Sequence, residues 1–74
     1  MPTLREFRLR RVLSQRELAT RAGVVQRTIV EAEAGRQVPH PATMRKLAEA
    51  LGVAVTDIDE FRCAIEQAVA RPAT

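Results

Sequence analysis

The side chains of this chain best suited to recognise a ligand lie together in the triplet Gln26-Arg27-Thr28, shortly after Gly23. Glutamine can bond the N6 and N7 positions of adenine together, and arginine can do the same with O6 and N7 of guanine. Threonine offers a hydroxyl to a phosphate or a base. The triplet is therefore a candidate for contacts with a nucleic acid, provided that the flanking elements hold it at the surface.

Those flanking elements are predicted to be short helices. Leu4 and Phe7 share a face in a first helix from Thr3 to about Val12. The pair Ser14 and Glu17 forms a capping box for a second helix, which Gly23 ends in the left-handed conformation of a C-terminal cap. A third helix is expected from about Gln26 to Ala34. Two short helices joined by a tight glycine turn can place the second helix in the DNA major groove.

Two further helices are predicted after the extended loop "RQVPHP". Pro41 suits the first turn of a fourth helix, with His40 as its substitute cap and Gly52 as its end. Thr56, with Asp59 three residues on, is predicted to cap a fifth helix that reaches about Ala70. The apolar stripes of these two helices are Met44, Leu47, Ala48 and Leu51 in the fourth, and Ile58, Phe61, Ile65, Ala68 and Val69 in the fifth.

Length and pattern predict an all-α fold in one domain, residues 1–74. Within it we expect a four-helix core at 3–55, a fifth helix at 56–70 and a loose tail at 71–74. The single cysteine, Cys63, excludes a disulfide framework, is expected to be a small packing residue and favours a reducing, cytoplasmic setting. The chain has no apolar run long enough to cross a bilayer, so we expect no membrane association.

Charge is distributed unevenly along the chain. Residues 1–46 hold ten Lys/Arg against four Asp/Glu, whereas residues 47–74 hold two against five, so the net charges are +6 and −3. The basic half is expected to face a polyanion. The single histidine and single cysteine lie well apart in the sequence, and no paired carboxylate site, metal cluster or phosphate-cradling loop is found. An enzyme, a metal site, a cofactor and a small-molecule ligand are therefore not expected.

The combination of these segments resembles the phage repressor and Cro-type (xenobiotic response element, lambda-repressor-like) helix-turn-helix family. "LSQRELATRAGVVQRTI" matches that family's core pattern, and "EAGRQVP" and "TMRKLAEALGV" match its loop and fourth helix. The similarity runs from about Leu4 to Ile58. It implies a compact five-helix DNA-binding domain with the helix-turn-helix at its second and third helices, and a sequence-specific transcriptional regulator, most often a repressor.

The resemblance also implies roles for individual positions. Gln26 and Arg27 match positions that contact base edges, and Gln15 matches one that typically bonds a phosphate. Phosphate contacts are further expected from Thr28, Arg36 and Gln37, whereas Arg8 and Glu33 match positions that form a structural ion pair between the first and third helices.

Two residues depart from the family pattern. Val25 stands where Ser or Thr usually caps the recognition helix, which forfeits a cap worth about 1 kcal/mol, and its side chain could instead meet a thymine methyl group. Glu31 is acidic where amide or basic residues are usual. It would repel phosphates unless it accepts a bond from cytosine N4 or pairs with a neighbouring arginine.

The fifth helix is expected to outrun so small a core. The residues Phe61, Ile65, Ala68 and Val69 are therefore predicted to form a homodimer interface, which would place two recognition helices roughly 34 Å apart on a near-palindromic operator. An alternative function remains open at this point. The same fold serves as a protein-interaction module, such as an antitoxin or a transcription adaptor, whose main partner is another protein.

Overall fold

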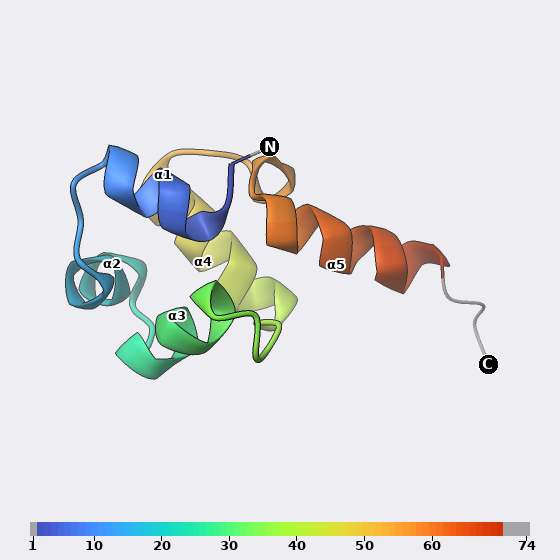
Figure 1. Ribbon diagram of the computed structural model, residues 1–74, viewed down its shortest axis with the longest axis horizontal. Coiled ribbons are helices and arrows are strands. Elements are labelled where there is room, and N and C mark those ends of the chain that lie inside the picture. Colours follow the sequence, from blue (N-terminus) through green and yellow to red (C-terminus); the bar gives the residue numbers. More distant parts are fainter. Residues whose placement is uncertain (1, 71–74) are drawn as a thin grey trace.

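The computed structural model describes residues 2–70, and every regular element in that part of the chain is helical (Figure 1). The predicted all-α fold with five α-helices is confirmed. The predicted tail at 71–74 lies outside the described residues. In chain order the elements are α1 (Leu4–Arg10), α2 (Gln15–Ala22), α3 (Gln26–Glu33), α4 (Pro41–Leu51), a short 3-10 helix η1 (Val55–Asp57) and α5 (Asp59–Ala70).

Capping boxes start the first two helices. Ser14 Oγ accepts a hydrogen bond of 3.0 Å from the Glu17 N–H, and Glu17 Oε1 accepts one of 2.9 Å from the Ser14 N–H. The bond from the Ser14 N–H to the carboxylate, followed by the effect of the nearby Ser14 hydroxyl, lowers the pKa of Glu17, because both favour its charged form. Thr3 and Glu6 form the same box at the start of α1. Each box satisfies backbone donors that the first turn of a helix leaves free.

The first four helices all end in the same hydrogen-bonding pattern. In each, a left-handed residue is followed by an N–H that donates to the carbonyl five positions back, as in a Schellman motif. Glycine occupies the left-handed position after α2, α3 and α4, with φ near +70°. After α1 the position is held by Val12, at φ 54. Because Val12 adopts the left-handed conformation, α1 ends at Arg10, two residues earlier than its apolar pattern predicts.

We expect Val12→Asn to raise the free energy of unfolding by about 1 kcal/mol. A β-branched residue is strained in the left-handed region, whereas asparagine tolerates it. Val12 is 85% exposed, so little packing is lost when its side chain changes. Urea denaturation of the purified protein measures the difference. Val38→Asn, at a second exposed valine outside the left-handed region, is the matched control and should give no gain. An equal gain at both positions would contradict the strain argument.

The start of α5 differs from the prediction. Thr56 does not cap that helix, because the chain first forms η1, in which the Asp57 carboxylate accepts a hydrogen bond from the Ala54 N–H. Ile58 is then extended and fully buried, and α5 begins at Asp59. Burial of the Ile58 side chain separates the two helical segments. His40 does occupy the position before α4, but its side chain makes no capping bond there.

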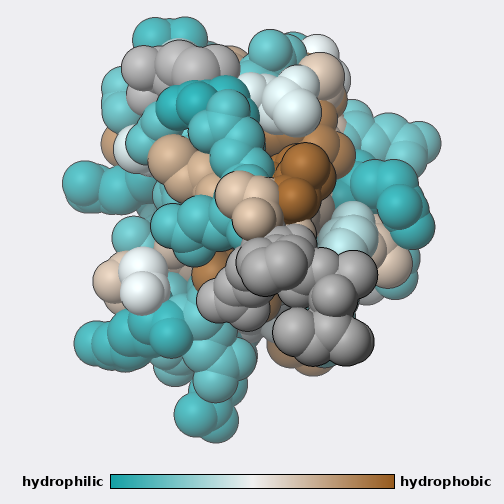
Figure 2. Space-filling model, turned by 90° about the vertical axis from the view of Figure 1, so that its right-hand side faces the viewer, coloured by the Kyte–Doolittle hydropathy of each residue, from teal (hydrophilic) through white to brown (hydrophobic). Residues whose placement is uncertain are grey.

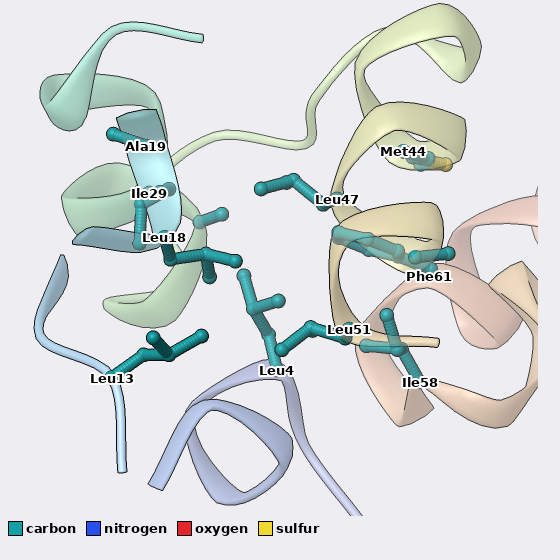
Figure 3. Packing of buried hydrophobic residues seen from close by; sticks show 12 residues of the cluster. Leu4, Leu13, Leu18, Ala19, Ile29, Met44, Leu47, Leu51, Ile58 and Phe61 are labelled. Atoms are coloured by element: carbon teal, nitrogen blue, oxygen red, sulfur yellow. The ribbon is translucent and has the colours of Figure 1, made fainter. Parts of the chain in front are cut away.

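A single hydrophobic core joins all five α-helices (Figure 3). Figure 3 shows leucines from α1, α2 and α4 meeting near its centre, with Ile29 of α3 on one side and Phe61 of α5 on the other. The twelve buried apolar residues are Leu4, Leu13, Leu18, Ala19, Ile29, Ala32, Met44, Leu47, Ala48, Leu51, Ile58 and Phe61. The inward face of α3 belongs to this core, so its orientation is fixed by packing.

Only the first part of α5 is packed on the rest of the domain. The Leu4 N–H donates to Glu60 Oε1 at 2.8 Å, which fastens the start of α1 to α5. Beyond this anchor α5 extends away from the other helices (Figure 1). Cys63 is exposed, which corrects its prediction as a packing residue, because it lies off the buried side of α5.

Candidate nucleic-acid interface

The turn between α2 and α3 is built around Gly23. This glycine has φ 71, and the following N–H, from Val24, donates to the Ala19 carbonyl at 3.0 Å. Such a positive φ costs glycine little, whereas a side chain would strain it. The turn brings α3 across α2, and Ile29 and Ala32 on the inner face of α3 are buried. The arrangement is a helix-turn-helix.

The residues that begin α3 point into solvent. The Arg27 side chain is 87% exposed, Gln26 is exposed, and Val25 is 67% exposed. Val25 occupies the N-cap position without a capping bond from its side chain, as its sequence predicts. Thr28 is half-buried. The side chains with base-recognising chemistry are therefore free to enter a groove.

A shallow hollow lies beside these residues, between α3 and the segment that leads into α4. Glu31 lines it from α3, while Val38, His40 and Thr43 line it from the loop and the first turn of α4. These last three residues are not among the site residues predicted from the sequence. Pro41 was the available signal, because it fixes the start of α4 and so places Thr43 in its first turn. The remaining lining residues are Val25, Arg27, Thr28, Gln37 and Pro39.

Glu31 bridges two arginines. Its Oε1 lies 3.7 Å from Arg27 Nε, and its Oε2 lies 3.7 Å from Arg36 Nη1. Arg36 and Gln37 are both exposed directly after α3. The acidic residue that departs from the family pattern is thus paired with neighbouring arginines, which is one of the alternatives that the sequence left open.

Arg8 ties α1 to α3. Its Nε donates to Glu33 Oε2 at 2.6 Å and its Nη2 to Glu33 Oε1 at 3.0 Å, while its Nη1 donates to the Leu13 carbonyl at 2.9 Å. The two charged side chains are only 9% and 6% exposed. The hydrogen bond with Glu33 raises the pKa of Arg8, so the guanidinium stays charged.

Gln15, the first residue of α2, belongs to the same network. Its Nε2 donates to Glu33 Oε1 at 3.1 Å. One of its amide hydrogens is therefore used inside the protein. A phosphate contact from this side chain would need the second amide hydrogen.

Phe61 is the residue of the predicted dimer interface that the structure places elsewhere. It is 1% exposed within a single chain, so it cannot contact a second copy. Its large apolar ring packs in the core at the start of α5, because this burial removes the ring from water. Ile65 is half-buried, whereas Ala68 and Val69 are exposed.

The fold and this surface define a helix-turn-helix domain. A family model described as a helix-turn-helix domain matches residues 3–61, and the chain belongs to that family. Membership indicates a DNA-binding regulator with DNA as its partner, and domains of this kind are typically not enzymes. No curated protein matches the chain. Within residues 2–70, every helix is too short or too polar to cross a membrane.

Proposed function

We propose that this protein is a sequence-specific regulator that binds double-stranded DNA and represses transcription by occupying its operator. The observation that carries the proposal is the division of α3 into two faces. Ile29 and Ala32 fix one face in the core, while Gln26 and Arg27 at the leading end are exposed. A helix held in this way presents its first residues to the major groove, which a helix of this width can enter.

In this proposal the contacts divide into two classes. Gln26 and Arg27 recognise base edges, with Val25 against a thymine methyl group and Glu31 close to the same bases. The phosphates are held by Thr28 within α3, by Arg36 and Gln37 shortly after it, and by Gln15 at the start of α2. The net charge of +6 on residues 1–46 favours the approach of this side to DNA.

Selection of bound sites from a pool of random duplexes tests the function. We expect one enriched sequence whose complex is at least about 10³-fold tighter than that of random duplex. This complex should weaken steeply as salt is added, because the counterions that binding displaces from the DNA then gain less entropy. A bound pool without any enriched sequence would contradict the proposal. Together with a stable complex with another protein, that result would favour the protein-interaction module.

We also propose that the regulator is a two-fold dimer formed through the far half of α5. Val69 is 80% exposed, and it follows the half-buried Ile65 on the part of α5 that leaves the body. Figure 2 views the molecule from the side toward which α5 extends, and it shows apolar surface among polar side chains there. A second copy would cover Ile65, Ala68 and Val69 and would set two α3 helices roughly 34 Å apart, one turn of DNA. The operator would then be nearly palindromic.

Sedimentation equilibrium at concentrations up to hundreds of micromolar checks this dimer. We expect self-association that Val69→Asp weakens by at least about tenfold, because each copy would bury an unpaired carboxylate. Val12→Asp introduces the same charge at an exposed valine in the connection between α1 and α2, on the side of the domain opposite to α5 (Figure 1), and serves as the control. A purely monomeric wild-type protein over this range would contradict the dimer.

A further inference from the structure

We propose that Glu31 is a specificity-determining positioning residue of the DNA-binding surface. By pairing with Arg27 and Arg36 it weakens binding to arbitrary duplex. This loss of binding free energy is offset only at the correct sequence. This inference rests on the proposed function. It assigns Glu31 a role through the arginines that it holds, instead of a direct base contact.

The geometry places Glu31 at the centre of a three-residue ion-pair cluster. Its side chain is 20% exposed, whereas those of Arg27 and Arg36 are 87% and 68% exposed. The carboxylate is therefore the sheltered member, and the two guanidinium groups are the accessible ones. Arg27 lies four residues before Glu31 on the same face of α3, so the helix itself sets their separation.

Arg36 is brought to Glu31 by the turn that ends α3. Its backbone N–H donates to the Glu31 carbonyl at 3.0 Å, across Gly35 at φ 73. The same Schellman-type bond that ends the helix thus places a second arginine beside the carboxylate. Two independent features, helical spacing and the glycine turn, converge on one acidic side chain.

These ion pairs contribute little to the stability of the fold, because both arginines are largely exposed to water. Their effect on a polyanion is larger. Contacts with phosphates drive binding to arbitrary DNA by releasing counterions, and a carboxylate beside both arginines repels those phosphates and competes for the same donors. At the correct site Arg27 donates two hydrogen bonds to guanine, while Glu31 retains Arg36. Such an element weakens wrong complexes more than the right one.

Glu31→Gln tests the role, because it removes the charge and keeps the size. Affinities for random duplex and for the selected site are measured by fluorescence anisotropy over a range of salt concentrations. We expect binding to random duplex to tighten about tenfold at low salt, with a salt slope steeper by about one. Binding to the selected site should tighten by less than about threefold, so the ratio of the two affinities falls.

Glu49→Gln is the matched control. Glu49 is exposed on α4, outside the hollow that Glu31 lines, and its substitution makes the same change in net charge. We expect the affinity ratio of this variant to stay within about twofold of wild type. A ratio that changes equally in both variants, or in neither, would overturn the inference. A loss of affinity confined to the selected site in Glu31→Gln would also overturn it, because Glu31 would then be a direct base contact.

Arg36→Gln closes a thermodynamic cycle that isolates the pairing. In the wild-type background it should weaken binding to random duplex by about threefold. In the Glu31→Gln background it should weaken that binding about tenfold, because there the Arg36 guanidinium no longer divides its charge and its donors between Glu31 and a phosphate. Equal losses in the two backgrounds would contradict the pairing. If the wild-type protein prefers no sequence at all, it is the proposed function that fails.

Discussion

Replacing Arg8 with alanine is expected to lower the free energy of unfolding by about 3–5 kcal/mol. The substitution removes all three hydrogen bonds of the guanidinium, to Glu33 and to the Leu13 carbonyl. It also leaves the Glu33 carboxylate, whose side chain is 6% exposed, with the Gln15 amide in place of a positive charge. An uncompensated charge buried to this degree is among the most costly single changes to a small domain.

Urea denaturation at neutral pH measures this loss. A domain of 74 residues has a total stability of about 4–11 kcal/mol, so the variant is expected to be marginally folded or unfolded at 25 °C. Arg5→Ala removes an exposed arginine of the same helix and should cost less than about 0.5 kcal/mol. Arg8→Met combined with Glu33→Leu should cost less than Arg8→Ala alone, because no buried charge remains. A loss below about 1 kcal/mol for Arg8→Ala would show that the ion pair does not hold α1 against α3.

The second large effect is expected from Arg27→Ala, on DNA recognition. If Arg27 contacts guanine, the variant should lose about 1–3 kcal/mol of binding free energy at the selected site and discriminate less at one base position. The fold should be unchanged, because the Arg27 side chain is 87% exposed. Equilibrium binding to the selected duplex and to its single-base variants measures both quantities.

Arg36→Ala is the comparison for this prediction. Arg36 is assigned to a phosphate, so its loss should weaken all duplexes by similar factors and reduce the salt slope by about one. Arg27→Ala and Arg36→Ala remove the same charge from opposite ends of one ion-pair cluster. If the two variants lost affinity by the same factor on every duplex, Arg27 would have no base-recognising role.

Much of the fold follows from local rules that the sequence displays. Ser14 and Glu17 start α2, and glycines in the left-handed region end α2 and α4 where predicted, because caps act over a few residues. The end of α1 is not visible in the same way, since Val12 occupies a position that glycine usually holds. The break before α5 also depends on a tertiary effect, the burial of Ile58.

The candidate site shows the same division. That the end of α3 beginning at Gln26 is exposed follows from its apolar period, which directs Ile29 inward. The position of Arg36 beside Glu31 depends on the turn at Gly35, and the bond from Gln15 to Glu33 joins two helices. Neither contact follows from spacing along one helix, so both required the three-dimensional arrangement.

The central claim is that the leading residues of α3 enter the major groove, and an NMR titration with the selected duplex tests it most directly. Amide shifts of the ¹⁵N-labelled protein should change most at residues 25–31 and 36–37. Replacing guanine with 7-deazaguanine, which lacks the N7 acceptor in the major groove, should weaken the wild-type complex and leave that of Arg27→Ala unaffected. Shift changes confined to α1 or α5, with residues 25–31 unperturbed, would contradict the account.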